Sequence, residues 1–231
     1  MNKLEIAAAE EAARVTSDGF RFLIEYVRPG MTEQDVANAL RAYFRALGYD
    51  AWAFRFIIAS GRNAAAPHHH PTNAVLKKGH SIVCDFGVRV RGICADMTRM
   101  LFLGTPSARQ KRMYALLRTA QQRAAKKARA GVSARATDTI ARAYLKQNGY
   151  NNRIFCHGLG HGVGKRIHQP PWLSPKKKEH LLAENDMITI EPGLYFKGRD
   201  GYRLEDMYLV TSHGVRELTN APKDIRSITI T

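Results

Sequence analysis

Four carboxylates lie in or beside apolar, strand-like segments of this sequence. Asp85 follows the apolar residues 82–84 and Glu191 follows 187–190. Asp96 and Glu205 come 11 and 14 residues later, each on a further strand-like run. An unpaired ionised carboxylate is costly to bury, so such acids are normally paired or bound to metal ions. Two divalent ions would neutralise four converging acids, as in a two-metal hydrolytic site.

These acids also follow an internal repeat. Residues 82–87 and 188–193 share one pattern, which is an apolar strand, a carboxylate, one spacer and a glycine. Any one acid taken alone is equally compatible with a surface turn, but four in repeat register are not. The repeat predicts two halves, each contributing helices and a hairpin with two acids, in an α+β fold with a central curved antiparallel sheet.

Histidines in three places add candidate ligands. Residues 157–164 are too rich in glycine for a stable helix and carry His157 and His161. His168 follows, and residues 68–70 form a triple His before the first acidic strand. We expect His69 and His70 to be incidental. Oxygen ligands with one imidazole indicate Mn, Co, Fe or Zn, and Cys94 is not expected to be a ligand.

The elements that must position these side chains follow from hydrophobic periodicity and caps. A Thr-x-x-Asp box at Thr32 marks one helix start, and glycine at Gly48 ends that helix. The expected helices are 3–28, 32–48, 107–130 and 134–148, the expected strands are 51–58, 81–86, 93–103, 187–190 and 202–210, and the expected loop is 60–73.

Composition is typical of a soluble globular protein. Of 231 residues, 45% are hydrophobic and 24% are charged. No apolar run reaches membrane-spanning length, and the first residues do not resemble a signal peptide. We therefore expect a cytoplasmic protein with one catalytic domain, residues 1–231, without a separate N-terminal domain. The three cysteines, Cys84, Cys94 and Cys156, are expected to be free, buried thiols.

The net charge of +16 is concentrated in one region. Residues 106–150 contain eleven Lys and Arg and one acid, Asp138. The simpler interpretation is the solvated outer face of two helices. The alternative is contact with RNA, the ribosome or a membrane surface, although no nucleic-acid-binding motif is present.

Five segments together carry a specific resemblance. The blocks are residues 82–87 (Ile-Val-Cys-Asp-Phe-Gly), 95–99 (Ala-Asp-Met-Thr-Arg), 157–164 (His-Gly-Leu-Gly-His-Gly-Val-Gly), 190–195 (Ile-Glu-Pro-Gly-Leu-Tyr) and 203–206 (Arg-Leu-Glu-Asp). In this order and spacing they resemble the signature blocks of the pita-bread metallopeptidases, which include methionine aminopeptidases, Xaa-Pro aminopeptidases and prolidases. The resemblance implies a curved sheet flanked by helices in two pseudo-symmetric halves.

The resemblance also implies a metal-ligand set. Asp85 would hold one divalent ion, His161 and Glu191 would hold the other, and Asp96 and Glu205 would bridge them. The two ions, with Mn or Co expected first and Zn or Fe open, would activate a water molecule.

Further roles are implied around these ligands. Glu191 would move the proton towards the leaving nitrogen, while His68 and His168 would hydrogen-bond the scissile carbonyl and the oxyanion. His157 and Trp172 would contact substrate. Arg203, in the same pocket, would steady the second bridging acid.

Within the family, the Asp-Phe-Gly and Glu-Pro-Gly-Leu-Tyr sequences and the short gap before Glu205 resemble the Xaa-Pro branch. Prolidase-like sequences often place Arg after the proline that here is Pro171, whereas this chain has Trp172. That favours an aminopeptidase acting on longer peptides. A methionine aminopeptidase, a prolidase-type dipeptidase and a non-catalytic basic binding module remain alternatives, and a homodimer is an open expectation.

Overall fold

Two β-sheets form the centre of the computed structural model, which describes all residues 1–231. The four-stranded sheet has the order β1 (Ile57–Ser60), β2 (Ser81–Phe86), β5 (Met97–Leu103) and β13 (Thr229–Ile230). The five-stranded sheet has the order β12 (Val215–Glu217), β11 (Asp206–Val210), β8 (Met187–Ile190), β6 (Gly160–Gly162) and β7 (Gln169–Leu173). Two short antiparallel pairs complete the strands, β3 (Arg89–Val90) with β4 (Ile93–Cys94) and β9 (Gly193–Phe196) with β10 (Asp200–Arg203).

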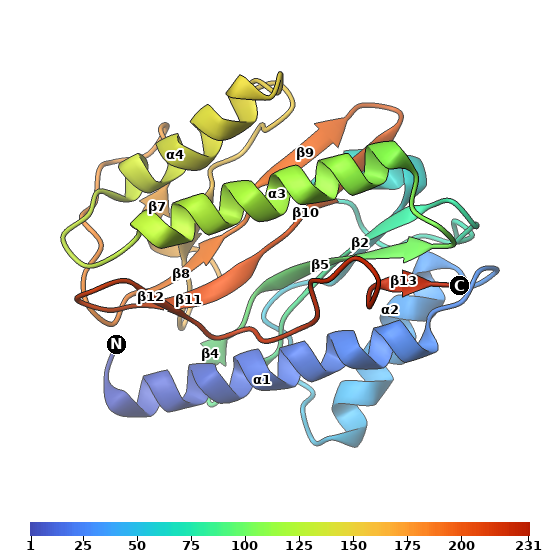
Figure 1. Ribbon diagram of the computed structural model, residues 1–231. Helices are drawn as coiled ribbons and strands as arrows, with labels where there is room; N and C mark the ends of the chain where they lie inside the picture. The colour runs from blue at the N-terminus through green and yellow to red at the C-terminus, as the bar shows by residue number, and fades with distance from the viewer.

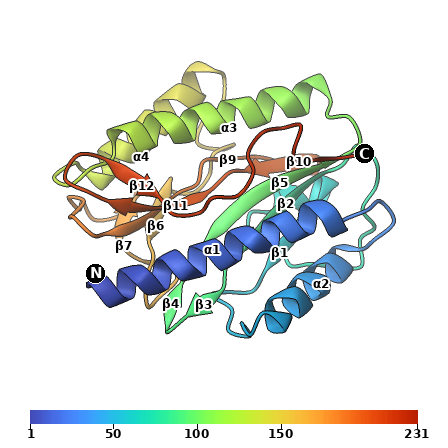
Figure 2. The same ribbon diagram turned by 60° about the horizontal axis from the view of Figure 1, so that its bottom comes forward.

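Helices cover the strands from two sides (Figures 1 and 2). The helices α1 (Lys3–Tyr26) and α2 (Glu33–Ala46) lie on one side, and α3 (Ala108–Lys127) and α4 (Ala134–Gln147) on the other. A short 3₁₀ helix, η1 (Gly61–Ala65), follows β1. The capping box predicted at the start of α2 is present, because Asp35 N–H donates to Thr32 Oγ1 at 3.1 Å and Thr32 N–H to Asp35 Oδ2 at 2.9 Å.

The internal repeat corresponds to two antiparallel strand pairs that carry the acids. In the first half β2 pairs with β5 and Asp85 lies opposite Thr98. In the second half β8 pairs with β11 and Ile190 lies opposite Asp206. The Glu205 N–H donates to the Thr98 carbonyl at 3.1 Å, so the two halves meet at the acids. One cluster of 61 buried apolar residues runs through both halves.

Several expected elements need correction. The strand at 51–58 is wrong for all but its end, because only Ile57 and Ile58 belong to β1. The preceding residues are irregular and are fixed by aromatic packing, with the Trp52 ring 5.2 Å from that of Phe56. The runs 93–103 and 202–210 are each interrupted where an acid leaves the ladder, before β5 and before β11.

Two other findings depart from the expectations. Strand β13 pairs in parallel with β5, so the sheet is not wholly antiparallel. All three cysteines are free, as predicted, but Cys156 is exposed while Cys84 and Cys94 are buried.

No helix is both long enough and apolar enough to cross a membrane.

Candidate metal centre

A cavity of about 430 Å³ lies where the two halves meet, and five metal-ligand candidates line it. Each comes from a different segment, so the cluster exists only in the folded chain. Asp85 lies on β2, Asp96 before β5, His161 on β6, Glu191 after β8 and Glu205 before β11.

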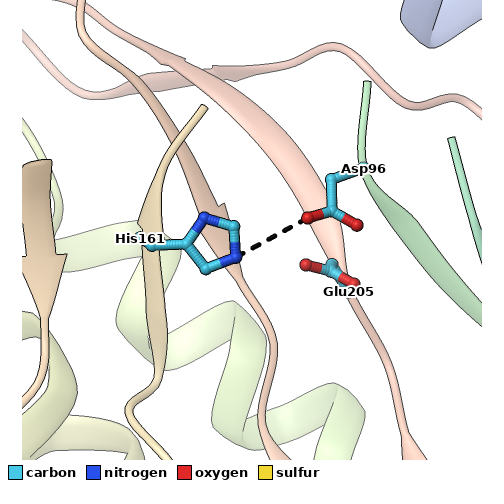
Figure 3. A group of neighbouring side chains, drawn as sticks. All are labelled: Asp96, His161 and Glu205. Carbon is cyan, nitrogen blue, oxygen red and sulfur yellow. Dashed lines mark ion pairs between the residues drawn. The ribbon is translucent and has the colours of Figure 1, made fainter. Parts of the chain in front are cut away.

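Three of these residues already form a compact donor set (Figure 3). One ligand atom each from Asp96, His161 and Glu205 lie within 4.8 Å of one another, and all three residues are buried. The His161 Nε2 atom is 3.6 Å from Asp96 Oδ2 and 3.3 Å from Glu191 Oε1. The other ring nitrogen of His161 lies 3.1 Å from the Gly162 carbonyl, a contact that directs Nε2 towards the acids.

Asp85 offers an oxygen atom that the protein itself does not satisfy. Its Oδ2 accepts a hydrogen bond from Arg203 Nη2 at 2.5 Å, but its Oδ1 is buried with no hydrogen-bond partner. Native proteins rarely leave a buried carboxylate oxygen unpaired, because its desolvation is costly. A cation beside Oδ1 would remove that cost.

The pKa shifts of the buried acids also indicate that cations belong in this cavity. Burial, together with repulsion from Glu205 and the other acids, raises the pKa of Asp96 well above its usual range. Burial and neighbouring carboxylates likewise raise the pKa of Glu205. Burial, reinforced by Asp85, raises the pKa of Glu191 to about 8. Divalent ions would stabilise the ionised acids, while burial lowers the pKa of His161 and keeps it a neutral ligand. The residues present fit a metal centre.

Arg203 lies in the cavity as expected, but its direct partner is different. The guanidinium binds Asp85 rather than Glu205. It reaches Glu205 through Thr98, because Arg203 Nε donates to Thr98 Oγ1 at 2.9 Å and that hydroxyl donates to Glu205 Oε2 at 2.6 Å. Sequence spacing could not show this, since Thr98 lies more than 100 residues from both partners.

The remaining expected residues also line the cavity. The His168 ring lies 4.4 Å from that of His161, and burial lowers the pKa of His168 to about 4. His157 Nε2 is 2.9 Å from the Tyr195 hydroxyl, and burial, with the Arg203 charge, lowers the pKa of His157 to about 3. His68 and Trp172 complete the set.

The structure adds four residues that the sequence interpretation did not include, and it places His70, which was expected to be incidental, on the cavity lining. Thr98 and Tyr195 hold Arg203. Both belong to the quoted signature blocks, so their place in the sequence was a usable signal. Arg55 and Lys177 line the cavity and had no such signal. Cys94 does not line it.

The glycine-rich segment owes its composition to close backbone packing. A Cβ atom on Gly160 would lie 2.0 Å from the Thr189 carbonyl oxygen of the neighbouring strand β8. Only glycine permits this approach. It brings β6, and therefore His161, against β8, the strand that Glu191 directly follows.

Comparison with known sequences agrees with this geometry. Residues 7–212 match Metallopeptidase family M24. An Xaa-Pro dipeptidase of Pyrococcus furiosus is 35% identical over 223 residues, covering 96% of this chain and 64% of the relative. An uncharacterised peptidase of Bacillus subtilis is 34% identical over 221 residues, covering 96% of this chain and 62% of the relative. The chain thus spans less than two thirds of the length of these relatives.

Solved structures are also similar. The X-Pro aminopeptidase from Thermotoga maritima superposes with a TM-score of 0.95 at 34% identity, covering 100% of this chain and 64% of that one. An Xaa-Pro dipeptidase from Bacillus anthracis gives a TM-score of 0.95 at 34% identity, covering 99% and 63%. These neighbours confirm the predicted α+β pita-bread fold, and the family match covers most of the chain. The protein belongs to metallopeptidase family M24.

Proposed function

We propose that the protein is a dinuclear-metal peptidase that hydrolyses the bond preceding proline in short peptides, Xaa-Pro dipeptides first among them. The observation that carries this proposal is the complete ligand set around one cavity, with His68 and His168 on its lining. The proline preference comes from the similar proteins, which include Xaa-Pro dipeptidases and an X-Pro aminopeptidase.

Asp85, Asp96, His161, Glu191 and Glu205 would hold two divalent ions. When bound, such ions polarise the scissile carbonyl and lower the pKa of water. Glu191 would accept a proton and return it to the leaving nitrogen. The neutral His168, together with His68, would hydrogen-bond the carbonyl oxygen as charge develops on it. We expect Mn or Co to support the reaction best.

Two cations on the cavity lining favour a dipeptide substrate over longer peptides. Trp172 in place of Arg favoured an aminopeptidase, on the ground that no cation would meet a dipeptide's carboxylate. Arg55 and Lys177, however, both line the cavity, and Lys177 Nζ lies 5.2 Å from the centre of the Trp172 ring. Either cation could bind a free carboxylate. The Xaa-Pro dipeptidase name also recurs among the relatives.

Hydrolysis assays on metal-stripped protein reloaded with Mn, Co or Zn test the proposal. We expect cleavage of Ala-Pro, slower cleavage of Ala-Pro-Ala and none of Met-Ala-Ser. Preference for Ala-Pro-Ala would indicate an aminopeptidase, and cleavage of Met-Ala-Ser alone would indicate the methionine branch. Loss of activity in His161→Ala would link the reaction to the metal centre. Inactivity with every metal would contradict the proposal.

A second candidate function rests on the charge of α3. This helix has seven Lys and Arg and no acid, and only Arg109 has a carboxylate partner, Asp200 at 2.9 Å. The other cations face no acid within ion-pair distance, which favours contact with a polyanion such as RNA. Salt-dependent RNA binding by Asp96→Ala protein would support this function, whereas no binding at low salt would exclude it.

The cytoplasmic location and the homodimer that the sequence led us to expect stay predictions. Cell fractionation would test the location, and sedimentation would test the oligomeric state.

A further inference from the structure

The segment that carries His68 is wrapped around the start of α2. It leaves β1 at Ser60, forms η1 and returns through residues 66–74. The Glu33 N–H donates to the Ala74 carbonyl at 3.1 Å, and the Gln34 N–H to the Thr72 carbonyl at 3.0 Å. The first N–H groups of a helix lack intrahelical partners, so this segment satisfies them.

The Glu33 side chain holds the same segment from inside. Its carboxylate is 0% exposed, yet it belongs to no part of the metal centre. Its two oxygens accept five hydrogen bonds from the segment. The donors are Ser60 N–H at 2.7 Å, Asn63 Nδ2 at 3.0 Å, His69 Nε2 at 2.8 Å, Thr72 N–H at 3.1 Å and Thr72 Oγ1 at 2.8 Å.

The charge state of Glu33 agrees with this role. Burial alone would raise the pKa of Glu33, but hydrogen bonds from His69, Ser60 and other donors outweigh burial and lower it. The group is therefore an ionised acceptor, and hydrogen bonds to an ionised acceptor are stronger than neutral ones.

His68 lies between two fixed neighbours. On the cavity side, Arg203 Nη1 donates to the Pro67 carbonyl at 3.2 Å. On the other side, His69 binds Glu33 and its ring is only 14% exposed, so His69 is not the incidental residue expected from the sequence. His68 itself is exposed at the cavity. Its direction therefore depends on the residues on either side.

We propose that Glu33 is a positioning residue, which acts through His69 and Thr72 to aim His68 into the cavity. The inference rests on the proposed function, because His68 matters there as a donor to the scissile carbonyl. Arg203 holds the segment at Pro67, next to His68, and Glu33 holds it on both sides of that point.

The test compares Glu33→Ala, Glu33→Gln and His69→Ala with a matched control, Asp35→Ala. Asp35 is an exposed acid in the same helical turn, and its carboxylate binds only Thr32. We expect Glu33→Ala to lower kcat about 10- to 100-fold, because small displacements of a catalytic group cost that much. Metal content and KM are expected to stay unchanged. Glu33→Gln keeps one acceptor oxygen and is expected to lose less, and Asp35→Ala to lose nothing.

A double-mutant cycle separates positioning from general damage. If Glu33 acts through His68, Glu33→Ala has no further effect on kcat in the His68→Ala background. An equal fold-loss in both backgrounds would overturn the proposal. Should Glu33→Ala fail to fold, His69→Ala and Glu33→Gln provide the same cycle.

Hydrogen exchange gives a readout that does not need activity. In the metal-loaded protein, amides of residues 61–72 are expected to exchange faster in Glu33→Gln than in Asp35→Ala. If the wild type cleaves no Xaa-Pro peptide, the proposed function fails while exchange still decides whether Glu33 orders the segment. Unchanged exchange in an otherwise folded variant would refute the role of Glu33.

Discussion

Arg99 of β5 and Asp206 of β11 form an ion pair in which both side chains are fully buried. Arg99 Nη1 also donates to the Glu205 carbonyl at 2.5 Å. Asp206 directly follows Glu205 and accepts further hydrogen bonds from Gln121 at 3.0 Å and Lys223 at 2.9 Å. The pair therefore fixes the backbone that presents Glu205 to the cavity.

We expect Arg99→Met to lower the free energy of unfolding. The change removes the guanidinium from a buried pair and leaves Lys223 as the remaining cation beside Asp206. Breaking a buried pair costs about 3–5 kcal/mol of unfolding free energy, and because Lys223 stays we expect a loss at the lower end of that range. Urea denaturation would measure it. Arg14→Met is the matched control, because its partner Asp18 is 34% and Arg14 itself 63% exposed, and surface pairs contribute about 0–1 kcal/mol. Equal losses in the two variants would contradict the burial argument.

His161→Ala should impair metal binding itself. The variant removes the only imidazole of the compact donor set and leaves its acids in place. We expect metal affinity to fall by more than about 100-fold, since even an outer partner of a ligand is worth 10–100-fold. Elemental analysis after dialysis against dilute metal would show fewer ions per chain. His157 lines the same cavity but is not part of the donor set, so His157→Ala is the control. Full metal content in His157→Ala would confirm that the loss in His161→Ala comes from a missing ligand.

Metal-free protein should become less stable as the pH rises from about 6.5 to about 8. Below pH 6.5 the lowered pKa values of the buried His157 and His168 act in the opposite direction. Burial raises the pKa of Glu191 from 4.5 to about 8, so the folded state binds this proton more tightly than the unfolded state. The resulting stability is complete below pH about 4.5 and is lost as the pH approaches about 8. Asp96 and Glu205 shift in the same direction.

The measurement is Tm in chelator against Tm with added metal, across that pH window. Metal ions displace the protons and bind the ionised acids, so their effect on Tm should grow with pH. A metal-induced shift of Tm that is constant with pH would argue that the acids are not protonated in the metal-free state.

Gly160→Ala should destabilise the protein by about 1–3 kcal/mol, as expected for overpacking. The added methyl would meet the Thr189 carbonyl and push β6 away from β8. Thermal unfolding would show the loss. Gly214→Ala is the control, because a Cβ there has no heavy atom within 4 Å. Similar Tm changes at the two positions would show that the loss does not come from the contact with β8.

Local patterns in the sequence were sufficient for much of the fold. The bounds expected for β2 and β8 match the structure, because these strands are continuous apolar runs. The start of α2 was readable from its capping box. The repeat of strand, acid and glycine likewise predicted that the acids of two halves would converge, and all of them line one cavity.

The contacts that organise the centre were not readable in this way. The partner of Arg203 is Asp85, 118 residues away, and Glu33 meets His69 across 36 residues. Periodicity identifies which face of an element is buried but not which polar groups meet there. The irregular path of residues 51–56 is likewise fixed by tertiary packing of Trp52 and Phe56 against Phe44 of α2, which overrides a β-like pattern.

The origin of the ligands in both halves has a kinetic consequence. Asp85 and Asp96 belong to the first half, and His161, Glu191 and Glu205 to the second. An ion held by both sets cross-links distant parts of the chain, so neither half can open without giving up ligands. Metal loading should therefore slow unfolding and lengthen survival in a protease, even at temperatures where the metal-free chain is still folded at equilibrium.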